Sequence, residues 1–169
     1  MLSKIYVISI FKLRFVTFYE IDKDAIEDLK NNLEYFELMD KSQIVNINVF
    51  DMNIRTNKTC LLEDKNNNKL EDRLSEFKYY DYVITNPPFG IQSVKSADIM
   101  FLEKALILAD EKIFSMHKST TYDFINKFYT SKGVKDIIKH EIQFDIPKTY
   151  KFHKEKNKVI KVCCVEANI

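Results

Sequence analysis

The chain has 169 residues, of which 46% are hydrophobic and 30% are charged, and its formal net charge at pH 7 is +1. This composition is that of a globular protein, and it excludes collagen-like, strongly charged disordered and disulfide-dense chains. No apolar run reaches the roughly 20 residues that a membrane-spanning helix needs. We therefore expect a single domain over residues 1–169, with one hydrophobic core.

The cysteines and the N-terminus indicate where the protein works. Cys60, Cys163 and Cys164 show neither C-x-x-C spacing nor histidines at zinc-site intervals, so we expect reduced thiols and no metal. The apolar residues 5–11 lack a small-residue cleavage site and run directly into Lys12, which favours a strand over a signal peptide. A cytoplasmic or nuclear location follows.

Periodic apolar residues predict strands and helices in alternation along the chain. The predicted strands cover residues 15–20, 43–49, 80–85, 112–117, 134–146 and 158–165. The predicted helices cover residues 23–39, capped by Asp22, then 97–110, and then a segment ending at Phe128 and capped by Ser119 or Thr120. The alternation predicts a mostly parallel α/β sheet, and the closing pair of strands predicts an antiparallel C-terminal edge.

Two polar regions interrupt this pattern. Residues 53–70, with three consecutive asparagines, predict an exposed loop inserted into the domain. Lysines crowd the C-terminal part and predict either a basic patch or a solvated surface. These lysines are Lys139, Lys148, Lys151, Lys154, Lys156, Lys158 and Lys161.

The most specific motif is Asn86-Pro87-Pro88-Phe89, directly after the strand predicted at residues 80–85. Two prolines remove two amide donors and fix φ, so the strand must end at the edge where open α/β sheets place their sites. The Asn86 side chain and the carbonyls of Asn86 and Pro87 can accept from an exocyclic amine. Two acceptors would align the amine nitrogen with an electrophilic methyl group.

Phe89 completes the motif with an aromatic ring. Stacking of a flat base on such a ring contributes about 1–3 kcal/mol, which predicts an unpaired or flipped base as the target. The alternative is an ordinary Pro-Pro turn with Phe89 in the core.

With these motifs, the chain resembles the class I S-adenosylmethionine-dependent methyltransferases, and within them the small enzymes that N6-methylate one adenine of small-subunit ribosomal RNA. The resemblance covers residues 16–165 and rests on five segments. These are FYEID at 18–22, VFDM at 49–52, NPPFG at 86–90, SMHKS at 115–119 and YKFHK at 150–154. The last two discriminate most, because DNA adenine, guanine and protein glutamine methyltransferases share the Asn-Pro-Pro-aromatic loop.

The resemblance implies a methyl transfer from S-adenosylmethionine to the N6 amine of an adenine in RNA. It implies that Glu20, at the end of the strand predicted at 15–20, accepts from the cofactor's ribose hydroxyls. It also implies that Asp51, where the strand predicted at 43–49 closes, accepts from the cofactor's adenine amine, with Met52 against the ring. An acidic residue that ends a strand also suits vicinal hydroxyls on physical grounds, although a helix cap or surface carboxylate is the alternative.

The resemblance also implies substrate residues and partners. The catalytic loop is Asn86, Pro87, Pro88 and Phe89, and the residues closing over RNA are Phe152, His153 and Lys154, with His153 alternatively a packing residue. His117 is expected to be structural. The implied partners are RNA, most specifically small-subunit ribosomal RNA, and a small zinc-binding activator subunit that docks by strand addition.

One feature departs from the family pattern. The fold normally begins with a strand and a glycine-rich turn, whereas the only glycines here are Gly90 and Gly133. We therefore expect an N-terminally truncated domain that lacks the usual first strand and binds S-adenosylmethionine weakly or not at all. The alternatives are a glutamine-N5 protein methyltransferase and a cofactor-free remnant of the fold that binds RNA or protein.

Overall fold

The computed structural model describes residues 14–52, 80–87, 97–147 and 157–169. The chain divides into two compact units, Met1–Glu76 and Phe77–Ile169, which are described separately below. The predicted strand at residues 5–11 and the predicted loop at 53–70 lie outside the described residues.

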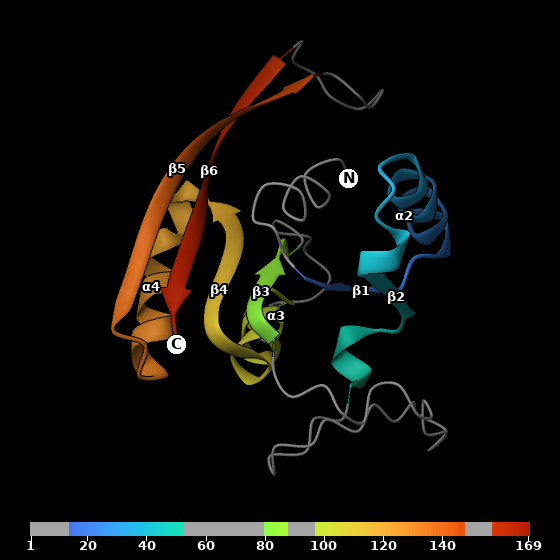
Figure 1. Cartoon of the computed structure of the whole chain (residues 1–169). Coiled ribbons are helices and arrows are strands. Elements are labelled where there is room, and N and C mark those ends of the chain that lie inside the picture. The colour runs from blue at the N-terminus through green and yellow to red at the C-terminus, as the bar shows by residue number, and fades with distance from the viewer. Residues whose placement is uncertain (1–13, 53–79, 88–96, 148–156) are drawn as a thin grey trace. The chain divides into compact units, whose positions relative to one another are not determined.

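The first unit contains a parallel βαβ arrangement (Figure 1). Strand β1 (Val16–Glu20) is followed by helix α2 (Lys23–Tyr35) and strand β2 (Ser42–Asn46). The two strands pair in parallel along their whole length, from Val16 opposite Ser42 to Glu20 opposite Asn46. Both strands therefore end at the same level.

Helix α2 starts where the sequence predicts. Asp22 is its N-cap, and the Asp22 carboxylate accepts a hydrogen bond from the Asp24 amide at 3.0 Å, which confirms the predicted cap. Ile26, Leu29 and Leu33 are buried at spacings of three and four residues. Leu29 and Leu33 pack against Phe18 of β1, so the apolar stripe of the helix covers the strand pair.

The helix ends at Tyr35, four residues before the predicted end at Met39. The Leu38 amide donates to the Leu33 carbonyl at 2.8 Å and the Glu37 amide donates to the Glu34 carbonyl at 3.0 Å. Glu37 has a left-handed φ of 54°. These are the two hydrogen bonds of a Schellman motif, which terminates the helix although the apolar periodicity continues.

Strand β2 is also shorter than predicted, ending at Asn46 rather than Val49. Residues Val49–Asp51 form the 3-10 helix η2, and the Asn48 side chain caps it by accepting from the Phe50 amide at 3.1 Å. A side chain that bonds to the backbone two residues on competes with strand pairing. Asp51 therefore ends this 3-10 helix and not a strand, which corrects the expectation.

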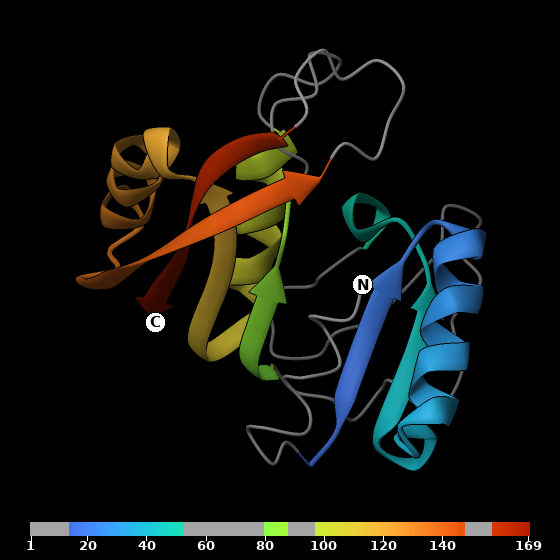
Figure 2. The same cartoon turned by 90° about the horizontal axis from the view of Figure 1, so that it is seen from above.

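The second unit is built on a four-stranded sheet of order β3-β4-β6-β5. Its elements, in chain order, are β3 (Tyr80–Thr85), α3 (Ala97–Leu108), β4 (Ala109–Lys118), the 3-10 helix η3 (Ser119–Thr121), α4 (Tyr122–Ser131), β5 (Asp136–Pro147) and β6 (Asn157–Asn168). Figure 2 shows the sheet twisting from β3 to β5.

The described strands pair in both parallel and antiparallel directions. β1 with β2 and β3 with β4 are parallel pairs, whereas β6 runs antiparallel to both β4 and β5. The antiparallel closing pair lies at the predicted side of the sheet, with β5 outermost and β6 beside β4. The expected parallel sheet with an antiparallel C-terminal edge is therefore confirmed in part: β1 and β2 form a parallel sheet, and the four-stranded sheet is mixed. It is mixed because β6 turns back from β5 and inserts between β4 and β5, two strands that are joined through α4.

Helices α3 and α4 pack on one face of this sheet. Their buried side chains form a single cluster with those of β4 and β6, made of Leu102, Ala105, Ile113, Ile125, Tyr129, Cys163, Val165 and Ala167, among others. Within it, the Ser115 and Tyr129 hydroxyls lie 3.3 Å apart, and burial raises the pKa of Tyr129 to about 12. Cys163 and Cys164 are free thiols in β6, as predicted.

The start of α4 differs from the prediction. The chain forms a 3-10 turn over Ser119–Thr121 before the helix, and neither Ser119 nor Thr120 is its N-cap. Thr121 stands at that position, and its hydroxyl instead donates to the Lys118 carbonyl at 2.8 Å. A 3-10 turn therefore connects β4 to α4, and no side chain caps the helix at the predicted positions.

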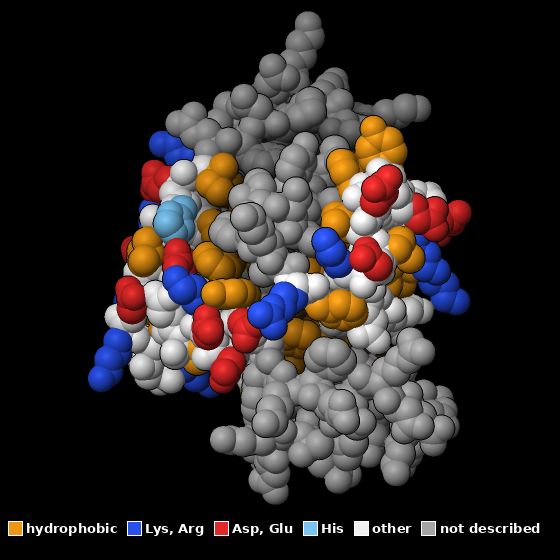
Figure 3. Space-filling model, viewed as in Figure 1, with side chains coloured by type: hydrophobic (Ala, Val, Ile, Leu, Met, Phe, Trp, Pro, Cys, Tyr) orange, Lys and Arg blue, Asp and Glu red, His pale blue; other side chains and the backbone are white. Residues whose placement is uncertain are grey.

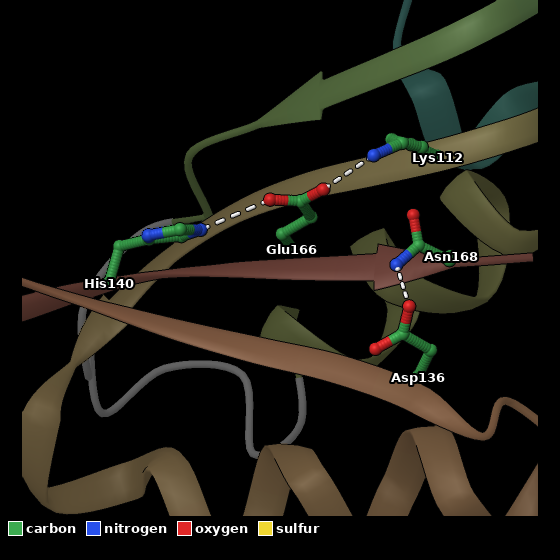
Figure 4. A network of polar contacts seen from close by, with 5 residues as sticks. All are labelled: Lys112, Asp136, His140, Glu166 and Asn168. Atoms are coloured by element: carbon green, nitrogen blue, oxygen red, sulfur yellow. Dashed lines mark hydrogen bonds and ion pairs between the residues drawn. The ribbon is translucent and has the colours of Figure 1, made fainter.

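A polar network ties the three strands β4, β6 and β5 together (Figure 4). The Glu166 carboxylate on the middle strand accepts from Lys112 Nζ at 2.6 Å and lies 3.1 Å from His140 Nε2. Nearby, the Asn168 amide donates to the Asp136 carboxylate at 2.6 Å. The Glu166 side chain is 13% exposed, and its hydrogen bonds, to Lys112 first and then to His140, hold its pKa below the usual value.

We predict that Glu166→Gln lowers the free energy of unfolding by about 1 kcal/mol at pH 7, because an amide cannot replace a charge-assisted contact to each neighbouring strand. Since pairing lowers the Glu166 pKa, this contribution is present at neutral pH and is lost as the pH falls through the folded-state pKa. Urea denaturation at several pH values measures both effects.

Glu141→Gln, in the neighbouring strand β5, provides the matched control. Glu141 pairs with Lys139 at 2.7 Å, but its side chain is 66% exposed, so solvent screening leaves little to lose. Equal losses in the two variants would show that the Glu166 network contributes no more than a surface ion pair.

Candidate functional site at the carboxyl ends of the parallel strands

In the second unit, the Asn-Pro-Pro motif begins at the end of a parallel strand pair. β3 ends at Thr85, which pairs with Ser115 of β4, and Asn86 and Pro87 follow directly. Asn86 is exposed and Pro87 is buried. The predicted bounds of β3 are confirmed, and Asn86 lies at the carboxyl end of the strand, where the sequence places it.

The apolar sequence of β3 suggests a strand that is buried on both faces, but in the structure one face is exposed. Val83 packs against the core under α3 and α4, whereas Tyr82 and Ile84 are 42% and 51% exposed. Side chains alternate between the two faces of a strand, so Tyr82 and Ile84 lie on the face opposite the helices. Tyr82 there lies against Phe114 of β4, with ring centroids 6.5 Å apart.

The carboxyl end of β4 carries buried polar groups. His117 is 3% exposed, and burial lowers its pKa to about 4, against the opposing effect of the Asp98 carboxylate. Among the described residues, His117 Nε2 and the buried Ser119 hydroxyl have no hydrogen-bond partner. His117 is thus a neutral imidazole within the core, which agrees with the structural role expected for it.

We predict that His117 makes stability depend on pH between about 4 and 6.5. The folded-state pKa is below that of the unfolded chain, so the unfolded chain binds more protons in this window and stability falls as the pH falls. The loss has an upper limit of about 3 kcal/mol, because one pKa unit corresponds to about 1.4 kcal/mol. Denaturant unfolding across this pH range, in wild type and in His117→Leu, measures it.

The same substitution at the exposed His140 is the control for this measurement. In His140→Leu, the free energy of unfolding should still fall between pH 6.5 and about 4. In His117→Leu, it should depend less on pH in this range. An identical pH dependence in wild type and His117→Leu would mean that the His117 imidazole takes up its proton without unfolding the core.

In the first unit, Glu20 ends β1 as predicted and its carboxylate bonds to the backbone that follows. Glu20 Oε1 accepts from the amides of Ile21 at 3.0 Å and Asp22 at 3.1 Å. The Asn46 side chain, at the end of β2, donates to the carbonyls of Glu20 at 2.9 Å and Ile21 at 3.2 Å. This end of the strand pair therefore presents a carboxylate whose orientation is fixed by local contacts.

The two other predicted cofactor residues follow β2. Asp51 is the last residue of η2, and Met52 directly after it is 2% exposed. Their roles toward an adenine ring stay predictions.

The structure groups the predicted residues within each unit only. Glu20, Asp51 and Met52 belong to the first unit, and Asn86 and Pro87 belong to the second. The remaining predicted site residues lie outside the described residues; they are Pro88, Phe89, Phe152, His153 and Lys154.

Sequence reasoning missed Asn46 and Asn48, two amides at the end of β2 that bond to the backbone of strand and turn. No clear signal in the sequence marks them, because the predicted strand continues past both residues to Val49.

Two negative findings apply to the part of the chain that the structure describes. It holds no cluster of three or more His, Cys, Asp or Glu side chains arranged to bind a metal ion. None of its helices combines the length and the apolar character needed to cross a lipid bilayer.

Comparison with known proteins identifies relatives of this chain. Over 144 residues, which are 85% of the chain, it is 33% identical to the rRNA N(6)-adenosine-methyltransferase METTL5 of Danio rerio. The chain is therefore similar to the METTL5 methyltransferases over most of its own length. It spans 59% of the length of the zebrafish protein. This similarity confirms the resemblance drawn from the sequence motifs. No protein-family model matches the chain.

Solved structures agree with this relationship at the level of the fold. The crystal structure of PH1948 from Pyrococcus horikoshii, a candidate RNA methyltransferase, superposes with a TM-score of 0.60 at 28% identity, covering 92% of this chain and 63% of that one. The N-terminal domain of human METTL16 in complex with SAH gives a TM-score of 0.53 at 16% identity, covering 90% of this chain and 51% of that one. The chain therefore has an α/β fold that matches methyltransferase structures, which confirms this part of the predicted fold class.

Proposed function

We propose that this chain is an RNA N6-adenine methyltransferase, or the greater part of one, acting on ribosomal RNA. The observation that carries the proposal is the start of the Asn86-Pro87-Pro88-Phe89 motif at the carboxyl end of β3, in a chain 33% identical to a METTL5 rRNA N(6)-adenosine-methyltransferase. We also propose a cytoplasmic or nuclear location, as the sequence predicts.

The catalytic step assigned to this motif is orientation of the target amine. The conjugated amine of adenine is a weak nucleophile, because its lone pair is delocalised into the ring. Asn86 Oδ1 would accept one N–H of this amine, and a main-chain carbonyl of Asn86 or Pro87 would accept the other. Both contacts raise electron density on nitrogen and fix its direction of attack, and Phe89 would stack on the base.

The proposed cofactor is S-adenosylmethionine, which supplies the electrophilic methyl group when it is bound. The hydrogen-bond acceptors of the first unit fit the adenosine half of this cofactor. The Glu20 carboxylate is held at the end of β1 and can accept from vicinal hydroxyls. Asp51 and Met52 would serve the adenine ring. With only Gly90 and Gly133 in the chain, no glycine-rich turn serves the methionine half, and we expect weak binding.

The RNA contacts are proposed for Phe152, His153 and Lys154, where lysines alternate with aromatic residues in the sequence. Figure 3 shows acidic and basic side chains interspersed on the visible face of the described residues, without one broad basic area. The family resemblance adds one further proposed partner, a small zinc-binding activator subunit that docks by strand addition to a sheet edge.

We predict that Asn86→Ala lowers methyl transfer by about 100-fold or more, the size of effect seen when one preorganised contact to the reacting group is removed. Binding of S-adenosylhomocysteine should stay within about twofold, since the Asn86 side chain holds the amine and not the cofactor. Transfer of tritium from labelled S-adenosylmethionine at millimolar concentration to small-subunit ribosomal RNA measures the first effect, and an NMR titration measures the second.

Asn31→Ala, a change of the same type on the exposed face of α2, is the control and should leave both values unchanged. Equal losses of cofactor affinity and transfer in Asn86→Ala would make Asn86 a structural residue. Methylation of a protein glutamine in place of RNA would favour the glutamine-N5 methyltransferases, which share the motif.

A further inference from the structure

Asn46 holds two consecutive peptide groups at the carboxyl end of β1. It is the last residue of β2 and pairs in register with Glu20. Its side-chain amide donates to the Glu20 carbonyl at 2.9 Å and to the Ile21 carbonyl at 3.2 Å, across 25 or more residues of sequence. The Ile47 amide also donates to the Glu20 carbonyl, at 3.2 Å. The end of β2 therefore fixes the backbone that leaves β1.

The same two peptide groups hold the Glu20 carboxylate. A trans peptide group is planar, and its C=O and N–H point in opposite directions. The carbonyls that Asn46 binds belong to the peptide groups whose N–H atoms, those of Ile21 and Asp22, donate to Glu20 Oε1 at 3.0 and 3.1 Å. Each peptide group is thus bound on one side by Asn46 and on the other by Glu20.

We propose that Asn46 is a positioning residue for Glu20, which it orients through these two peptide groups before the cofactor binds. The proposal rests on the ribose-binding role proposed above for Glu20. Without the Asn46 amide, the Ile21 carbonyl loses this contact and the Glu20 carbonyl keeps only the Ile47 amide, so the two N–H atoms hold the carboxylate less firmly in one direction. A preoriented carboxylate binds the vicinal hydroxyls of a ribose more tightly, because less side-chain freedom is lost on binding.

The test uses the full chain, with S-adenosylhomocysteine as the probe. Asn46→Leu keeps the approximate shape of the side chain and removes its donors, whereas Asn46→Gln keeps the donors. We expect Asn46→Leu to weaken S-adenosylhomocysteine binding about tenfold in an NMR titration, and Asn46→Gln to restore part of it. Combined with Glu20→Ala, Asn46→Leu should cause no further loss, since it acts only through Glu20.

A second measurement is independent of the cofactor. Hydrogen exchange of the Ile21 and Asp22 amides should become about tenfold faster in Asn46→Leu, and it should stay near the wild-type rate in Asn31→Leu, a control on the exposed face of α2. Unchanged exchange, or a loss of affinity that adds fully to that of Glu20→Ala, would overturn the proposal. If wild type binds no S-adenosylhomocysteine, hydrogen exchange alone decides whether Asn46 positions this carboxylate.

Discussion

Parallel strand pairing determines where this chain presents its polar side chains. In a parallel pair, both strands end at the same edge, and the side chains that follow them are brought together there. The pairing of Glu20 with Asn46 ends β1 and β2 at one level, and the pairing of Thr85 with Ser115 brings Asn86 to the end of β3. Each unit therefore has its candidate site at the carboxyl ends of its parallel strands.

The contacts near those edges differ in kind. At the end of β1, two peptide groups accept hydrogen bonds from Asn46 of β2 and donate hydrogen bonds to the Glu20 carboxylate. At β4, the buried neutral imidazole of His117 follows directly from the core that α3 and α4 build on the sheet. On the face of the sheet opposite the helices, Glu166 of β6 joins β4, the pairing partner of β3, to β5.

The sequence predicts the strands at residues 16–20 and 80–85 and the cap at Asp22, because each depends on local pattern and short-range hydrogen bonds. It fails at the end of α2, where Glu37 adopts a left-handed conformation that glycine normally occupies, so no glycine marks the end. It fails also at β2, where Asn48 closes a 3-10 turn inside an apolar run. The antiparallel closing pair could be predicted, whereas the insertion of β6 between β4 and β5 depends on long-range packing that no local pattern encodes.

For the candidate site, the motif at Asn86 and the acidic residue at Glu20 could be predicted, because their chemistry is visible in the sequence. The role of Asn46 could not be predicted, because its partners are 25 or more residues away and meet it only when β1 and β2 pair. Asp51 was predicted at a strand end because the length of β2 was overestimated. Sequence thus indicates the candidate polar groups, while strand pairing brings other residues into contact with the backbone beside them.

The central claim is that the chain methylates the N6 amine of adenine in ribosomal RNA. Mass spectrometry of nucleosides tests it most directly, after incubation of the chain with small-subunit ribosomal RNA and millimolar S-adenosylmethionine carrying a deuterated methyl group. We predict deuterated N6-methyladenosine with the wild-type chain, and at least about 100-fold less with Asn86→Ala. No labelled nucleoside with the wild-type chain, or a label on another position of the base, would contradict it.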